Sequence, residues 1–242
     1  MKLKNYNNIF LILDSDNEPS YDYNRHIWRQ YMNTNTDILC MFIKYDNQLQ
    51  EEVKYVENSN TLYIKGEEKY ECDAIYTKTL LALKYIDTNF NYKYVIRTNL
   101  SSFWNFENLQ EYLNQRQHGK YLMGWLVSNT NDCENPFISG TGIIIPNNLV
   151  PLIFKHTKTK YCMDDIEISE FYRSQQVDII CARRKLHNFV CKFEFKLKEE
   201  IDTHFEKMKD QKIVYYRVKS TENREENDKY CLDKLLKKCY NL

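Results

Sequence analysis

The sequence is short of glycine, which makes up only 5 of its 242 residues. A phosphate-binding P-loop needs the spacing Gly-x-x-x-x-Gly-Lys, and a dinucleotide-binding fold needs Gly-x-Gly-x-x-Gly. Neither spacing occurs among Gly66, Gly119, Gly124, Gly140 and Gly142. The sequence therefore excludes P-loop NTPases and the usual NAD- or FAD-binding Rossmann enzymes. Any nucleotide phosphate that this chain binds has to be held in another way.

Long apolar runs and closely spaced cysteine pairs are also missing. No run approaches the roughly 18 apolar residues of a membrane span, and Ile9–Leu13 is too short for the core of a signal peptide. The 8 cysteines include no Cys-x-x-Cys pair, so neither a zinc ribbon nor a redox motif is indicated. We expect a cytoplasmic protein with reduced thiols and no membrane span.

The chain has no excess of positive charge, because 34 Lys and Arg residues balance 34 Asp and Glu residues. Bulk nucleic-acid binding depends on a basic surface, so we expect no nucleic-acid partner. With 43% hydrophobic and 14% aromatic residues, the chain can bury a core. That composition argues against global disorder.

Short apolar runs bounded by polar turns predict the strands of a sheet. These runs are Ile9–Leu13, Ile38–Ile43, Thr61–Ile64, Tyr94–Ile96, Tyr121–Val127, Ile143–Ile145, Phe189–Phe195 and Ile213–Val218. Segments typical of helices separate most of them: Ile27–Met32, Asp73–Ile86, Asn105–Gln115, Asn147–Lys155, Asp164–Arg173, Glu199–Lys209 and Asp228–Tyr240. The alternation predicts an α/β fold with a mainly parallel central sheet flanked by helices, ending in a strand and a helix.

Two candidate sites follow predicted strands. Asp14 comes directly after the first strand, where ligands of open parallel sheets bind, although a solvated turn would look the same. The run Arg97–Ser102 follows the strand Tyr94–Ile96 and offers a guanidinium, an amide and hydroxyls to a ribose or a phosphate. The alternative is an ordinary turn in which Ser102 or Asn105 caps the next helix.

A third candidate concentrates two of the few glycines in the segment Ser139–Gly142, just before a buried strand. Glycine allows a positive φ or a close approach to the backbone, so the segment predicts bare backbone at a ligand. The alternative is a tight entry into the strand. The basic run Arg183–Lys185 is interpreted as a solvent-exposed surface.

A fourth candidate is the acidic start of a predicted helix, Asp164–Glu167. Acids at this position favour the helix dipole, and an Asp near an acceptor hydroxyl could also act as a general base. At helical spacing Asp165 and Glu167 diverge, so at most two of the three acids can point into one cleft.

A fifth candidate is the basic set His204, Lys212, Arg217 and Lys219. Arg217 and Lys219 lie two residues apart on a predicted strand and therefore share a face, where two cations could neutralise a diphosphate. The alternative is a solvated edge strand protected by lysine.

In order, these segments resemble a glycosyltransferase of the GT-A fold, and most of all the inverting β-1,3-galactosyltransferase and Fringe group. Asp73–Thr79 resembles a helix start of that family, with Lys78 and Thr79 on its Lys-Thr pair. Tyr94–Ser101 stands where the family has a strand ending in an Asp-Asp-Asp metal motif. Phe137–Gly142 resembles its aromatic-x-Ser-Gly-x-Gly segment, and Asp164–Ile166 its acidic helix start.

The main departure from the family lies in Asn99–Ser101, which replaces the Asp-x-Asp pair that holds a divalent metal. Neutral Asn and Ser side chains bind Mn²⁺ or Mg²⁺ poorly. Two interpretations follow. Cations such as Arg217 and Lys219 replace the metal, or the site has decayed and the protein only binds a nucleotide or a carbohydrate.

The resemblance implies one domain over residues 1–242, with a nucleotide-binding half at 1–130 and an acceptor half with the C-terminal helix at 131–242. It implies an inverting transfer from a nucleotide sugar, a UDP-sugar, to a glycan or protein acceptor. Because the Asp pair of the family is missing, we expect no required cofactor, with Mn²⁺ disfavoured. Asp165 is the expected base, and Asp164 the second catalytic acid. The expected donor-binding residues are Asp14, Lys78, Arg97, Asn99, Ser101, Ser139, Gly140, His204, Arg217 and Lys219.

The chain end, Tyr216–Ser220 followed by Arg224 and Asp228, is similar to glycosyltransferase-like proteins of large DNA viruses and some bacteria. A viral source would place the protein in the host cytoplasm or the virion. An alternative function is a catalytically inactive binding protein or virion component. A nucleotidyltransferase is a third possibility, and the missing Asp pair counts against it because that reaction needs metal-binding acids.

Overall fold

The computed structural model describes residues 3–16, 18–69, 72–116, 119–127, 135–156, 161, 163–181 and 188–242, and the side chains at 72, 73 and 188 are not described. These residues form two compact units that interleave along the chain. The first unit contains Met1–Ser15, Thr36–Asn99 and His118–Ala182, and the second contains Asp16–Asn35, Leu100–Gln117 and Arg183–Leu242. The predicted division into halves at residue 130 stays a prediction.

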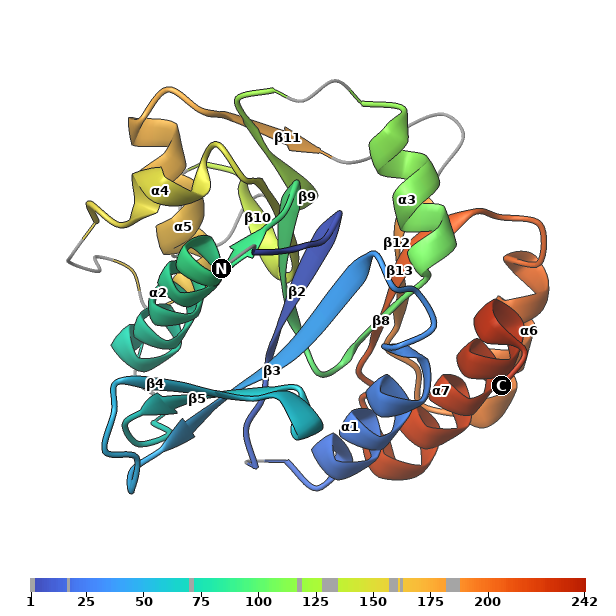
Figure 1. Ribbon diagram of the computed structural model, residues 1–242. Helices are drawn as coiled ribbons and strands as arrows, with labels where there is room; N and C mark the ends of the chain where they lie inside the picture. The colour runs from blue at the N-terminus through green and yellow to red at the C-terminus, as the bar shows by residue number, and fades with distance from the viewer. Residues whose placement is uncertain are drawn as a thin grey trace. The chain divides into compact units, whose positions relative to one another are not determined.

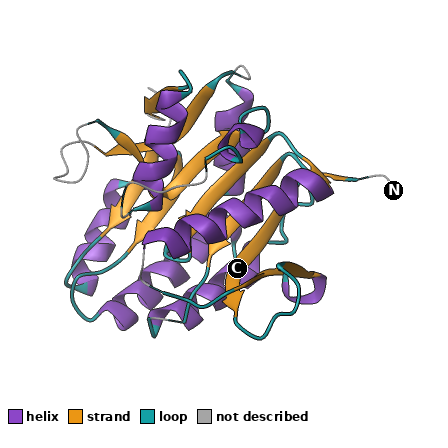
Figure 2. Ribbon diagram, turned by 90° about the vertical axis from the view of Figure 1, so that its left-hand side faces the viewer, coloured by secondary structure: helices purple, strands orange, loops and turns teal. Residues whose placement is uncertain are grey.

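The first unit contains an eight-stranded sheet in the order β11-β9-β10-β7-β2-β3-β5-β4 (Figures 1 and 2). Its strands are β2 (Asn8–Leu13), β3 (Ile38–Asp46), β4 (Val53–Val56), β5 (Thr61–Lys65), β7 (Tyr94–Asn99), β9 (Tyr121–Val127), β10 (Phe137–Pro146) and β11 (Asp178–Cys181). Strands β7, β2, β3 and β5 run parallel, whereas β10 is antiparallel to both neighbours. The short strands β1 (Lys4–Asn5) and β6 (Phe90–Asn91) pair separately.

Apolar residues explain why β2 lies in the middle of this sheet. Ile9, Phe10, Leu11 and Ile12 are all 0% exposed, as expected for a parallel strand that is covered on both faces. Three helices of the same unit pack together against the sheet (Figure 1). They are α2 (Cys72–Asn89), α4 (Val150–Ile153) and α5 (Asp164–Ser174), and a 3₁₀ turn lies at Glu57–Ser59.

The second unit contains a three-stranded sheet in the order β12-β13-β8 and four helices. The strands are β8 (Ser102–Trp104), β12 (Asn188–Phe193) and β13 (Ile213–Val218), and the helices are α1 (Ser20–Tyr31), α3 (Phe106–Asn114), α6 (Lys198–Lys207) and α7 (Arg224–Tyr240). Aromatic stacking joins these elements: Trp104 lies 4.5 Å from Tyr215, and Tyr31 lies 4.7 Å from Tyr240, between ring centroids. Asn105 caps α3 by accepting from the Asn108 backbone N–H, which the alternative interpretation of the run Arg97–Ser102 allowed.

Two polar segments predicted to lie outside strands lie inside them. Strand β7 extends to Asn99, because Arg97 and Thr98 have internal hydrogen-bond partners and the ladder continues through them. Ser139–Gly142 lies within β10, where the register shifts between Ile138 and Ile143, and does not precede the strand. A prediction from polarity alone was therefore wrong for the end of β7 and for the start of β10.

Other bounds differ because pairing and packing extend or shorten an element. Helix α1 begins at Ser20 and α7 at Arg224, whereas the helix expected over 147–155 is only the four residues of α4. Strand β13 is central, not an edge strand, because β8 and β12 pair with its two sides.

No helix among the described residues is both long and apolar enough to cross a membrane.

Candidate active site

A buried ion pair lies at the carboxyl end of β7 in the first unit. Arg97 is 3% exposed, and its Nη2 donates to both carboxylate oxygens of Asp164 at 2.7 Å. Its Nη1 donates to Asn99 Oδ1 at 3.0 Å and to the carbonyl oxygen of Gly140. One side chain thus ties together β7, β10 and the start of α5.

Asp165, the predicted base, follows directly on α5. Its Oδ2 accepts from the Gly140 N–H at 2.7 Å and its Oδ1 from the Ile166 N–H at 3.0 Å. Burial raises the pKa of Asp165 above its ordinary value, the charge of Asp164 raises it further, and Arg97 and the two N–H groups oppose the rise. A carboxylate with a raised pKa and a fixed position suits proton abstraction.

Glu167 has partners of its own, as the predicted divergence from Asp165 requires. It is 3% exposed, forms an ion pair with Nε2 of His156, and accepts from the Tyr161 N–H at 2.9 Å. His156 packs against Phe171, with 4.8 Å between ring centroids. No local pattern predicts the His156–Glu167 pair, because His156 lies between α4 and α5 and its contact with Glu167 depends on the tertiary fold.

Lys78 is buried on α2, 2% exposed, and its ammonium already has three acceptors. Nζ donates to the Asp14 carbonyl oxygen at 2.9 Å and to both carboxylate oxygens of Glu68 at 2.8 Å. Burial lowers the pKa of Lys78, and the charge of Glu68 opposes that shift. Lys78 therefore fixes the end of β2, and a contact with a nucleotide would have to replace one of these bonds.

Gly140 makes room for Arg97. A Cβ at position 140 would lie 2.3 Å from Arg97 Nη1. Gly140 has no positive φ, and Ser139 Oγ bonds to Thr141 Oγ1 at 3.1 Å. The space predicted for a sugar at Gly140 is thus filled by a guanidinium, and direct contact of Ser139 or Gly140 with a sugar stays a prediction.

In the second unit, Arg217 is partly buried on β13 and donates to Ser101 Oγ. Burial lowers the pKa of Arg217, and nearby Arg224 lowers it further. Among the residues that the structure describes, no carboxylate lies within ion-pair distance of Arg217, whereas Arg224 pairs with Glu18 at 2.8 Å and Asp228 at 3.3 Å. Arg217 is a cation held with a neutral partner.

The basic set predicted around Arg217 does not gather on one face. Arg217 is in register with Lys192, whereas Cys191 is in register with Tyr216 and therefore points to the opposite face of the sheet. His204 contacts Cys191, with 3.0 Å between Nε2 and Sγ, so His204 and Arg217 lie on opposite faces. Lys219 is exposed beyond the end of β13, and exposed Lys212 pairs with Glu111.

The side chain of Asp73, in the segment that resembles a family helix start, and the basic run 183–185 lie outside the described residues. Within the described residues, no group of three or more His, Cys, Asp and Glu side chains is placed to hold a metal ion. At the position of the expected metal motif, Asn99 Oδ1 accepts from a guanidinium, which would repel a divalent cation.

No protein-family model and no curated protein sequence matches the chain. Among solved structures, it is similar to a glycosyltransferase involved in the glycosylation of the major capsid of PBCV-1, with a TM-score of 0.55 and 9% identity over 93% of this chain and 98% of that one. It is also similar to mouse xyloside xylosyltransferase 1, with a TM-score of 0.44 and 6% identity over 88% and 97%. A third is the galactosyltransferase LgtC, with a TM-score of 0.41 and 9% identity over 92% and 83%.

The likeness to the PBCV-1 protein shows a shared fold. The predicted GT-A-like α/β architecture, with a largely parallel central sheet flanked by helices, is confirmed. The two structures with TM-scores of 0.44 and 0.41 add no weight to that conclusion.

Proposed function

We propose that the protein is a glycosyltransferase that moves a sugar from a nucleotide-sugar donor, a UDP-sugar, to a hydroxyl group of a glycan or protein acceptor. The glycosyltransferase-like fold supports sugar transfer in general. The observation that carries the proposal is Asp165, a carboxylate with a raised pKa, held at the start of α5 by the Gly140 N–H. Such a group is suited to take a proton from an attacking hydroxyl.

The proposed step is a single displacement with inversion. Asp165 accepts the proton of the acceptor hydroxyl while the oxygen forms a bond to the anomeric carbon, and the bond from that carbon to the diphosphate breaks. The electron pair of the broken bond stays on the nucleoside diphosphate. Asp164 keeps its two bonds to Arg97 throughout, so it acts by fixing the start of α5 and not by moving a proton.

The proposal needs no divalent metal. Asn99 offers a neutral oxygen that already accepts from Arg97, so a cation is present where a metal would bind. The leaving diphosphate would instead be neutralised by Arg217, whose hydrogen-bond partner, Ser101, carries no charge. A phosphate oxygen would supply a direct ionic partner, whereas Glu194 acts on Arg217 only through its charge and forms no ion pair with it.

The remaining donor contacts are assigned by residue. Asp14, Lys78, Ser139 and Gly140 would contact the nucleoside or sugar from the first unit, with Lys78 exchanging one internal acceptor for the ligand. Lys219 is exposed and would contribute long-range charge. His204, on the face opposite Arg217, has no part in the diphosphate contact.

A panel of nucleotide sugars tests the proposal. Each donor is incubated with the protein in EDTA and, separately, in Mn²⁺, and release of nucleoside diphosphate is measured with and without candidate acceptors. The expected result is turnover of a UDP-sugar in EDTA, with the product anomer inverted by NMR. Turnover that requires Mn²⁺ contradicts metal independence. Binding of UDP with neither transfer nor hydrolysis of any donor would identify an inactive binding protein.

A further inference from the structure

Three side chains with sulfur or imidazole donors meet in the second unit, on the face of its sheet opposite Arg217. Cys191 Sγ lies 3.0 Å from Nε2 of His204 and 2.8 Å from Sδ of Met208. Cys191 is 9% exposed and Met208 3% exposed. We call these residues the Cys-His-Met cluster.

Secondary structure fixes this arrangement. His204 and Met208 are one helical turn apart on α6 and its C-cap, where the Met208 N–H bonds to the His204 carbonyl oxygen at 3.1 Å. Residues spaced by four share a face of a helix. That face packs on β12, because Phe193 contacts the ring of His204 at 5.2 Å and that of Phe205 at 5.0 Å between centroids. His204 and Met208, from α6 and its C-cap, therefore face Cys191 on β12.

The cluster has more lone pairs than hydrogens. A thioether has no hydrogen to donate, and the one hydrogen of a thiol can point at only one acceptor. A neutral imidazole adds one N–H, and its tautomer decides whether His204 Nε2 donates to Cys191 or accepts from it. In either case the two sulfurs keep lone pairs that a cation placed among the three donors would use.

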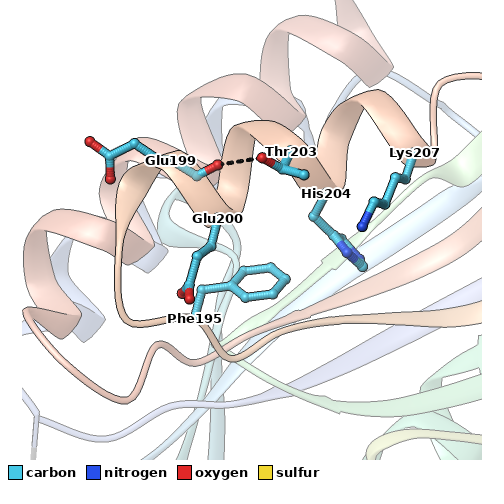
Figure 3. Close-up of a pocket in the computed structure, with 6 residues that line it drawn as sticks. All are labelled: Phe195, Glu199, Glu200, Thr203, His204 and Lys207. Atoms are coloured by element: carbon cyan, nitrogen blue, oxygen red, sulfur yellow. Dashed lines mark hydrogen bonds between the residues drawn. The ribbon is translucent and has the colours of Figure 1, made fainter.

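A route from solvent reaches the cluster. A pocket of about 340 Å³ is lined by Phe195, Glu199, Glu200, Thr203, His204 and Lys207. Figure 3 shows His204 and Glu200 extending from α6 toward the side on which the Phe195 ring lies. His204 lines this pocket and also contacts Cys191, so it connects the pocket to the cluster.

We propose that the Cys-His-Met cluster binds one soft monovalent metal ion, Cu(I). Thiolate and thioether sulfur select soft cations, and imidazole is a good ligand of copper. On binding, the Cys191 thiol gives its proton to solvent as the bond from sulfur to Cu(I) forms, with no change in oxidation state. A thiolate and a Cu(I) ion together are neutral, which avoids an unpaired charge in a buried site. Lys238, which donates to the Met208 carbonyl oxygen at 3.1 Å, lies close enough to favour the thiolate.

The test is an anaerobic competition for Cu(I) between the protein and a coloured Cu(I) chelator, followed by X-ray absorption on the loaded protein. The expected result is one tightly held Cu(I) per chain, with two sulfur ligands and one nitrogen ligand. Cys191→Ser is expected to weaken binding more than 100-fold, and Met208→Leu by at least about 10-fold, the loss that even an outer partner of a metal site causes. His204→Gln removes the nitrogen ligand from the absorption spectrum.

Cys181→Ser is the matched control, because Cys181 is an exposed free thiol on β11 in the first unit. It is expected to leave Cu(I) affinity unchanged. The proposal is overturned if the wild-type protein fails to compete with the chelator, or if Cys191→Ser and Cys181→Ser bind Cu(I) as tightly as the wild type. Met208→Leu conserves volume, so it keeps the test valid if circular dichroism shows that Cys191→Ser is unfolded. None of these readouts depends on sugar transfer.

Discussion

The arginines Arg97 and Arg217 have very different surroundings. Arg97, in the first unit, has two bonds to the Asp164 carboxylate and a third to Asn99. Arg217, in the second unit, donates to the Ser101 hydroxyl, and no described carboxylate pairs with it. A guanidinium with an internal counterion stabilises structure, whereas one without it is available for a ligand anion. From this difference we propose that Arg97 is a scaffold residue and that Arg217 contacts the phosphate.

The largest expected effect concerns the proton acceptor that the first unit holds in place. Asp165→Asn is expected to lower turnover by about 10²- to 10⁴-fold, the usual contribution of a general base. Nucleotide binding should survive, because Asn keeps an oxygen that can accept from Gly140. Steady-state kinetics with separate kcat and KM values checks this, and an unchanged kcat would remove Asp165 from the role.

The same residue predicts a pH dependence. Because burial raises the pKa of Asp165, kcat is expected to fall as the pH drops through that raised value, at a higher pH than an ordinary aspartate would give. The folded state binds the Asp165 proton more tightly than the unfolded state does, because the pKa is raised on folding. The free energy of unfolding therefore falls as the pH rises from the unfolded pKa through the folded one. At neutral pH, Asp165→Asn should therefore unfold at no lower urea concentration than the wild type. A marked loss of stability would contradict the burial argument.

The next largest effect concerns the buried pair itself. Arg97→Met leaves the Asp164 carboxylate buried without its partner, which is expected to lower the free energy of unfolding by about 3–5 kcal/mol. The double variant Arg97→Met/Asp164→Leu should recover most of that loss. Urea unfolding of the three proteins checks the prediction. Equal stability of Arg97→Met and wild type would show that Arg97 is not a scaffold residue.

A smaller effect is expected at Gly140. Gly140→Ala places a Cβ 2.3 Å from Arg97 Nη1, and Arg97 is too well bonded to move aside at low cost. Overpacking of this kind costs about 1–3 kcal/mol. In the Arg97→Met background the same substitution should cost less, because the guanidinium is gone. A double-mutant cycle by urea unfolding measures the difference, and simple additivity of the two changes would contradict it.

The smallest effect on stability is expected for Arg217. Arg217→Met loses one hydrogen bond to Ser101 but relieves the desolvation of a charge, and the two changes oppose each other. The free energy of unfolding should change by no more than about 1 kcal/mol. A loss as large as that of Arg97→Met would erase the contrast between the two arginines.

The sequence predicted the apolar elements well and the polar contacts poorly. Strands β9 and β13 match the predicted bounds, because each is a mainly apolar run bounded by polar residues. Arg97 was expected in a turn because it is polar and follows an apolar run. The ion pair that lets it stay in the strand is made with Asp164, 67 residues away, and local sequence patterns do not show such a contact. The central place of β13 likewise depends on pairing with the distant strand β8.

Within the site, the acids at the start of α5 could be predicted, because helix dipoles favour them and spacing separates Asp165 from Glu167. The partners of those acids could not. An arginine has an internal ion-pair partner only if the fold brings a carboxylate next to it. Arg97 has such a partner in Asp164, whereas Arg217 donates to the Ser101 hydroxyl. Local sequence shows each only as a basic residue in or next to a predicted strand.

The most direct test of this contrast is a calorimetric titration of UDP in EDTA into wild type, Arg217→Met and Lys212→Met. Lys212 is an exposed lysine of the same unit that pairs with Glu111, so its substitution removes the same charge elsewhere. A charge-assisted bond is worth about 1.5–3 kcal/mol, so Arg217→Met should weaken UDP binding by about 10- to 100-fold while Lys212→Met binds as the wild type does. Equal UDP affinity for wild type and Arg217→Met would contradict the account.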